Sequence, residues 1–140
     1  MKILVAVDGS PYTKRMLAYL AAHDEWLGEH HEYTVLHSVM AVPPRAAAAL
    51  DKSVLAAYYE SEADKVFKPI RQFFAKQKLS ATFVSKIGHA AENIAGVATK
   101  GKFDLLMMGS HGHGSLGQLV MGSVTTKVMA HCTTPVLLVR

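Results

Sequence analysis

Glycine is concentrated in residues 109–123, which read GSHGHGSLGQLVMGS and follow the apolar run FDLLMM. Five glycines in fifteen positions would let the backbone approach a polyphosphate and present its N–H groups. The N-terminus of a following helix would add a partial positive charge. Ser115, Ser123 and Thr125 offer hydroxyl donors, and Lys127 lies nearby in the sequence. This composition favours phosphate binding, with a flexible turn as the alternative.

The two histidines of this loop raise the alternative of a metal site. His111 and His113 are two residues apart, and His89 ends a predicted strand at the same edge of the sheet. Zinc needs further ligands fixed by their own hydrogen bonds, and the spacing predicts no third one. The only cysteine, Cys132, lies at the far end of the last predicted helix. We therefore expect no metal site, and we keep as an alternative that His113 lies close to the phosphates as a pH-sensitive donor.

Short apolar runs that alternate with longer amphipathic segments predict the elements that position the loop. Buried strands are expected at 3–7, 33–40, 81–87, 103–108 and 135–139. Helices are expected over 10–28, from about 50 to 74, around 92–98 and over 115–132. Pro69 should kink the second helix, and AVPPRAAAAL before it should be an exposed connection. The alternation indicates a single α/β domain over 1–140, an open five-stranded parallel sheet with helices on both faces.

A second unusual residue falls at the same edge of such a sheet. In the common strand order 3-2-1-4-5, ligands bind between the carboxyl ends of the first and fourth strands. The first strand ends at Asp8, which could accept hydrogen bonds from a ribose or hold a magnesium ion that bridges to phosphates. No P-loop motif is present, and GHGSLG at 112–117 follows the fourth strand, so we do not interpret it as a Rossmann motif.

Composition excludes several classes of function. The chain has 140 residues, a formal charge of +4, 50% hydrophobic and 19% charged residues, as in a globular protein. Its lysines and arginines are spread out, which argues against a nucleic-acid ligand. No apolar run reaches the length of a membrane span, and the first one stops at Asp8, short of a signal peptide. We therefore expect a cytoplasmic protein without disulfides.

Over essentially its full length the chain resembles the universal stress proteins. The resemblance rests on ILVAVDGS, VLHSV, GHAAENI, DLLMMGSHG and GSVTTKVMAHCTTPVLLVR. ATP-binding members of that family share the motif G-x2-G-x9-G-[ST], and Gly109, Gly112, Gly122 and Ser123 have this spacing. The resemblance implies an adenine nucleotide α-hydrolase-like fold that binds ATP, with Mg accompanying the phosphates.

The resemblance also implies a role for each candidate site residue. Asp8 would contact the ribose, with Ala6 and Met108 on the adenine side, and Gly109 and Gly112 would bring backbone amides to the ribose and phosphates. The phosphates would further be held by four residues at the second end of the loop, Gly122, Ser123, Val124 and Thr125. Ser38 stands where valine is common beside the adenine and removes one apolar contact. The usual G-x-P turn reads Gly88-His89-Ala90, which predicts a looser turn.

The function implied is that of an ATP-binding universal stress protein that acts as a nucleotide-dependent switch or regulator. Two alternatives remain: a slow ATPase or phosphotransferase, and a nucleotide-free interaction scaffold. The motif contains no evident base or arginine finger, so any hydrolysis should be weak. The last strand, 135–139, is an apolar edge, and the resemblance implies a homodimer that pairs these strands antiparallel. Its protein partner is unknown.

Overall fold

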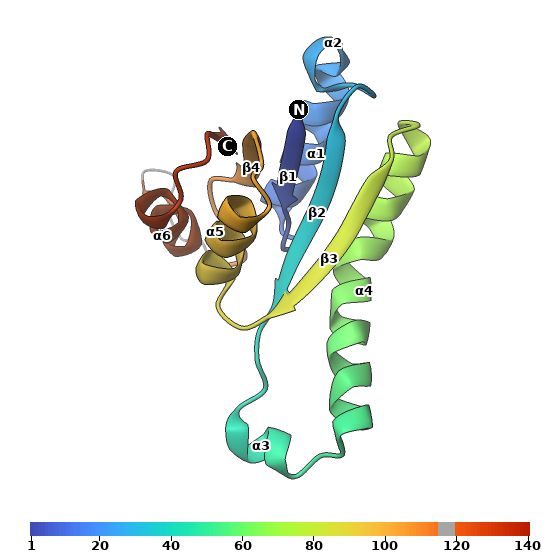
Figure 1. Cartoon of the computed structure of the whole chain (residues 1–140). Helices are drawn as coiled ribbons and strands as arrows, with labels where there is room; N and C mark the ends of the chain where they lie inside the picture. Colours follow the sequence, from blue (N-terminus) through green and yellow to red (C-terminus); the bar gives the residue numbers. More distant parts are fainter. Residues whose placement is uncertain (115–119) are drawn as a thin grey trace.

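The computed structural model describes residues 1–114 and 120–140. In this part of the chain five strands form one parallel sheet: β1 (Lys2–Ala6), β2 (Glu32–Val39), β3 (Ala81–Ile87), β4 (Leu105–Gly109) and β5 (Val136–Val139). Their order is β3-β2-β1-β4-β5, which confirms the predicted topology (Figure 1). The first and fourth strands are therefore neighbours, as the position of the predicted site requires.

The central strand shows why these segments are apolar throughout. Val5 of β1 aligns with Val35 of β2 and Met107 of β4, and all three are fully buried. Successive residues of a strand point to opposite faces of its sheet. Ile3 and Val5 accordingly pack into one hydrophobic cluster, while Leu4 and Ala6 pack into another on the opposite face. A sheet covered on both faces selects continuous apolar runs of this kind.

The described residues contain six helices: α1 (Pro11–Ala22), α2 (Asp24–Leu27), α3 (Pro44–Ala48), α4 (Lys52–Lys76), α5 (Ala90–Lys100) and α6 (Ser123–His131). Helices α1 and α4 pack with Ile3 and Val5, whereas α5 and α6 pack with Leu4 and Ala6. None of the described helices is long and apolar enough to cross a membrane.

Two helix predictions need correction. The first predicted helix, 10–28, is divided at His23, whose non-helical φ of −127° and ψ of 46° separate α1 from α2. The last predicted helix, 115–132, begins only at Ser123, because the Gly122 N–H donates to the Ser110 carbonyl; residues 115–119 lie outside the described part. Helix α4 is continuous over Lys52–Lys76 with Pro69 inside it, and the kink predicted there stays a prediction.

The predicted exposed connection before α4 contains the short helix α3 and is otherwise confirmed. Together with the first turns of α4, it projects well beyond the carboxyl ends of the strands (Figure 1). We call residues 40–60 the arm.

Candidate functional site

A cavity of about 270 Å³ opens at the carboxyl ends of β1 and β4. Its volume lies close to the lower end of small-molecule sites, about 300 Å³. All eleven candidate site residues line it: Ala6, Asp8, Ser38, Met108, Gly109, Gly112, His113, Gly122, Ser123, Val124 and Thr125. The structure thus brings together residues from four separate segments of the chain. Their roles toward a nucleotide stay a prediction.

One end of the cavity is an apolar slot. Ala6 and Met108, from adjacent strands, are buried there as predicted. Leu36 of β2 and Ile94 of α5 complete the slot, and the sequence analysis missed both as site residues. Leu36 lies two positions before Ser38 and therefore on the same face of β2, a periodicity that could have identified it. The slot has the chemistry needed to hold a flat, largely apolar group.

The Ser38 side chain forms two hydrogen bonds within the protein. Its hydroxyl donates to the Gly88 carbonyl (3.1 Å) and accepts from the Asn93 side-chain amide (2.7 Å). The Gly88 N–H donates to the Val39 carbonyl (2.9 Å), and the Gly88 φ of +119° favours glycine. These bonds hold the turn between β3 and α5 in the absence of the proline, and whether it is looser than a G-x-P turn stays a prediction.

Asp8 is held in place by one of its two carboxylate oxygens. Asp8 Oδ1 accepts hydrogen bonds from the Ser10 backbone N–H (2.9 Å) and the Thr13 hydroxyl (3.0 Å). Within the described residues no hydrogen bond reaches Asp8 Oδ2. A Cβ on Gly112 would stand only 2.8 Å from this second oxygen, so glycine is required for their close approach. Asp8 is therefore a preoriented acceptor with one oxygen available, and Thr13 orients it.

The start of α6 forms the opposite wall of the cavity. The Gly122 N–H donates to the Ser110 carbonyl (2.9 Å), and the Thr125 hydroxyl bonds the Gly109 and Ser110 carbonyls (3.1 and 3.2 Å). The N–H groups of the first turn have no acceptor within their own helix, and no side chain in the described parts of the chain caps them. These donors, with the helix dipole behind them, are suited to an anion.

Both loop histidines bond to backbone carbonyls. His113 Nε2 donates to the Asp8 carbonyl (2.7 Å), and His111 Nε2 donates to the Val120 carbonyl. The His111 ring also lies 5.0 Å from the Tyr12 ring. In the described parts of the chain, no three His, Cys, Asp or Glu residues gather as a metal site. His89 is the residue directly before α5, and it forms no such group with His111 and His113 in the described residues.

Two further candidate donors need comment. Lys127, close to the loop in the sequence, is exposed on α6 and is not among the described residues that line the cavity. Ser115 lies outside the described residues.

Known proteins match the chain along its whole length. A universal stress protein of Thermus aquaticus is 33% identical, over 99% of this chain and 97% of that protein. The structure is similar to that of the universal stress protein UspA of Lactobacillus plantarum, with a TM-score of 0.76 and 23% identity over 100% of this chain and 97% of the other.

Two similar structures contain a nucleotide. One, a universal stress protein family member of Arabidopsis thaliana with AMP bound, has a TM-score of 0.70 and 14% identity over 99% of this chain and 90% of the other. The other is a universal stress protein in complex with cAMP, with a TM-score of 0.65 and 15% identity over 100% of this chain and 96% of the other. At these identities the likeness concerns the fold. The universal stress protein family model matches residues 1–140, and this chain therefore belongs to the universal stress protein family.

Proposed function

We propose that the cavity binds an adenine nucleotide, ATP together with Mg, and that its occupancy makes this protein a nucleotide-dependent regulator in the stress response. One observation carries the proposal. Along one cavity lie an apolar slot, a carboxylate oxygen without a partner among the described residues, and the N–H groups that begin α6. A base, a ribose and phosphates need these three chemistries. The two nucleotide-bound relatives support the same class of ligand.

The donor set accounts for how each part of the nucleotide would be held. Ala6 and Met108 would contact the base, and Asp8 Oδ2 would accept from a ribose hydroxyl. The backbone of Gly112 and the first turn of α6 would face the phosphates. No Lys or Arg is among the described residues that line the cavity. Mg would supply the positive charge that the phosphates need, which is why we include it.

The residues that line the cavity favour binding of ATP over its hydrolysis. Phosphoryl transfer needs an oriented nucleophile and positive charge that stabilises the transition state. Asp8 is the one carboxylate among the described lining residues, and two of its contacts already hold its Oδ1. A slow ATPase or phosphotransferase remains the second candidate, since His113 at the rim could bond a phosphate.

We also propose that the protein acts as a homodimer through β5 and is cytoplasmic, as predicted from the sequence. In the described structure β5 pairs with β4 alone, on one side. Its residues Val136, Leu137 and Leu138 are half-buried. A second copy of the strand would satisfy the backbone groups of this apolar edge.

Calorimetric titration with ATP, ADP, AMP, cAMP and GTP, each with and without Mg, tests the nucleotide. We expect adenine nucleotides to bind, Mg to strengthen binding of ATP, and Gly122→Val to abolish it. A Cβ at Gly122 would lie 3.1 Å from His111 Cα, so a larger side chain displaces the loop. If no nucleotide binds the parent protein while circular dichroism shows it folded, the interaction-scaffold function is correct instead.

A further inference from the structure

The polar side chains that line the cavity are unevenly placed around it. Among the described lining residues, only His37 and Ser38 bring a polar side chain from β2. The His37 ring lies 6.2 Å from the ring of Phe67 in α4, and its Nδ1 donates to the Val7 carbonyl (2.8 Å). Ser38 lies on the opposite face of β2, together with Leu36 of the apolar slot. The Ser38 hydroxyl is therefore the polar side-chain group that β2 presents on the face of the slot.

The order of the strands places Ser38 at the base end of the proposed nucleotide. Strands β2, β1 and β4 lie side by side in that order. Asp8 follows β1, and the start of α6 bonds to Ser110, which follows β4. A ligand with its phosphates at α6 and its ribose at Asp8 therefore extends its base toward β2. Ile94, which completes the apolar slot from α5, is the neighbour in sequence of Asn93, the residue that donates to Ser38.

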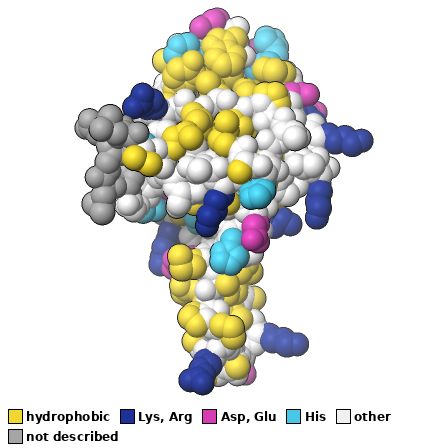
Figure 2. Space-filling model, turned by 90° about the vertical axis from the view of Figure 1, so that its left-hand side faces the viewer, with side chains coloured by type: hydrophobic (Ala, Val, Ile, Leu, Met, Phe, Trp, Pro, Cys, Tyr) yellow, Lys and Arg dark blue, Asp and Glu magenta, His cyan; other side chains and the backbone are white. Residues whose placement is uncertain are grey.

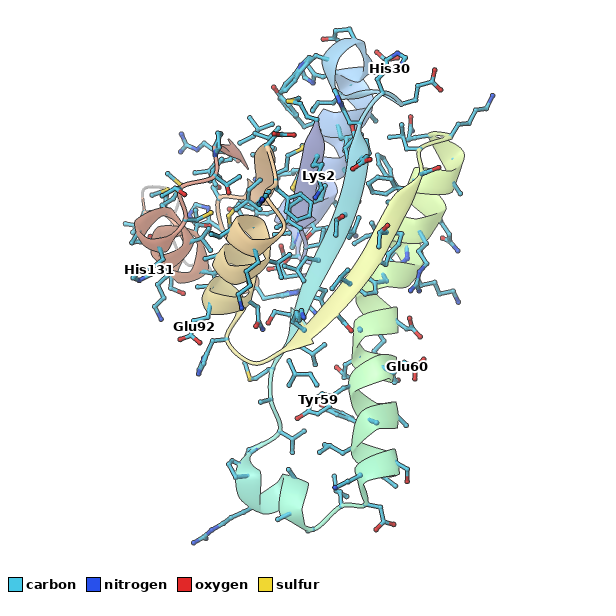
Figure 3. All side chains as sticks on the ribbon, viewed as in Figure 1. Lys2, His30, Tyr59, Glu60, Glu92 and His131 are labelled. Carbon is cyan, nitrogen blue, oxygen red and sulfur yellow. The ribbon has the colours of Figure 1, made fainter. Side chains whose placement is uncertain are left out.

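Ser38 is also the last residue of β2 that lines the cavity in the described structure. Val39 packs into the hydrophobic cluster on the opposite face of the sheet. The arm that follows projects away from the body (Figure 2), and none of its residues is among the described ones that line the cavity. Glu92, beside Asn93 in α5, is exposed, and its side chain points away from the strands (Figure 3). The base end of the cavity therefore ends at an uncharged hydroxyl.

The hydrogen bonds of Ser38 decide what its hydroxyl can offer a ligand. A hydroxyl has one proton to donate and two lone pairs that accept. The proton is donated to the Gly88 carbonyl (3.1 Å), and one lone pair accepts from the Asn93 side-chain amide (2.7 Å). One lone pair is left, so toward the cavity Ser38 is an acceptor. Turning the proton toward a ligand would take it from the Gly88 carbonyl, and a part-buried carbonyl that loses its partner is destabilising.

We propose that Ser38 selects the purine of the bound nucleotide, because its hydroxyl oxygen accepts a hydrogen bond from the exocyclic amino group of adenine. This inference rests on the proposed nucleotide binding and goes beyond it, since it assigns the choice of base to one residue. Adenine has an amino donor at position 6, whereas guanine and hypoxanthine have a carbonyl acceptor there. A carbonyl that faces the Ser38 oxygen leaves two acceptors opposed without a proton, and sites built for a hydrogen bond reject such ligands strongly. Ser38, interpreted from the sequence as the loss of one apolar contact, is thus a specificity-determining residue.

Three nucleotides that differ at position 6 of the purine test this assignment in the full chain. ATP carries the amino group, purine riboside triphosphate carries hydrogen alone, and inosine triphosphate carries the carbonyl. In calorimetric titration with Mg, we expect ATP to bind about tenfold more tightly than inosine triphosphate, with purine riboside triphosphate between them. In Ser38→Ala the three Kd values should agree within about twofold, because alanine offers no acceptor.

Asn93→Ala is the matched control for a merely structural role of this network. It also breaks the hydrogen bond between Asn93 and Ser38, but it keeps the hydroxyl and its bond to Gly88. We expect this variant to retain the preference of the parent protein for ATP over inosine triphosphate. A preference lost equally in both variants would mean that the turn between β3 and α5 sets the specificity, and it would overturn the role of Ser38.

The parent protein tests the assignment without any variant. Equal Kd values for ATP and inosine triphosphate would overturn it, and so would a Ser38→Ala variant that keeps the preference of the parent protein. In both cases ATP binds, and the proposed function stands. A folded parent protein that binds none of the three nucleotides would instead refute the proposed function, and the role of Ser38 with it.

Discussion

Adding one methyl group at Gly112 should weaken nucleotide binding through Asp8. Alanine there places its Cβ 2.8 Å from Asp8 Oδ2, whereas ordinary contacts begin at about 3.4 Å. The carboxylate would have to retreat by about 0.6 Å. It cannot retreat freely, because Ser10 N–H and the Thr13 hydroxyl hold its other oxygen. The methyl group therefore acts on the one oxygen that we assign to the ribose.

The size of the effect follows from the hydrogen bond at risk. A hydrogen bond to a charged group contributes about 1.5–3 kcal/mol, and about 1.4 kcal/mol corresponds to a tenfold change in affinity. We expect Gly112→Ala to raise the Kd for ATP with Mg by about ten- to a hundredfold in calorimetric titration. The backbone at Gly112 is not left-handed, so alanine itself introduces no strain there.

Gly114→Ala is the matched control, since Gly114 lines the same cavity two residues later. A Cβ there meets no atom of the described residues within 4 Å, and its backbone is not left-handed either. We expect its Kd to stay within about twofold of the parent protein. The double variant Gly112→Ala with Asp8→Ala should have the same Kd for ATP with Mg as Asp8→Ala alone, because the two substitutions act on the same interaction of Asp8. Equal losses in the two glycine variants, or additive losses in the double variant, would refute the role of Asp8.

Three further predictions concern other parts of the fold. Gly96→Ala in α5 should raise the free energy of unfolding by about 1 kcal/mol, since its Cβ meets nothing within 4 Å; a lower urea midpoint would contradict this. Burial raises the pKa of Tyr33 to about 12, above its usual 10. The contribution of Tyr33 to the free energy of unfolding should therefore be fully present below pH 10 and be lost as pH rises toward 12, a loss on the order of 2 kcal/mol. In Tyr33→Phe the free energy of unfolding should fall less over the same pH range. Leu138→Pro should convert the proposed β5 dimer to a lighter species in light scattering, because the N–H of residue 138 faces the open edge; an unchanged mass would exclude pairing there.

The sheet and most of the cavity could be predicted because both depend on local patterns. Continuous apolar runs identify buried strands, and topology rules then bring the ends of β1 and β4 together. The glycine spacing is fixed by close contacts, such as a Cβ at Gly109 that would stand 2.6 Å from Tyr12 Cβ. Topology and composition thus predicted Asp8 and the glycine-rich loop, whereas the resemblance to the universal stress proteins implied the remaining candidate residues, such as Ala6 and Met108.

What the sequence left out depends on backbone geometry and on contacts between segments, which apolar spacing does not reveal. The break at His23 follows from local dihedral angles that the apolar spacing of 10–28 does not reveal. Thr13 looks like an ordinary helix residue until its hydroxyl is seen on Asp8. The start of α6 is set by the bond from Gly122 to Ser110, twelve residues away. The arm was predicted as exposed, but its projection depends on how far α4 extends past the sheet.

Ser110 is the residue at which the cavity and the edge strand meet. Its carbonyl accepts from Gly122 N–H and the Thr125 hydroxyl, both at the start of α6. Its own N–H donates to the Val139 carbonyl of β5 (2.9 Å), and its side chain is buried. A phosphate that draws the first turn of α6 toward itself therefore acts on the strand proposed to form the dimer. Because such coupling is reciprocal, a nucleotide that strengthens dimerisation must itself bind the dimer more tightly by the same factor.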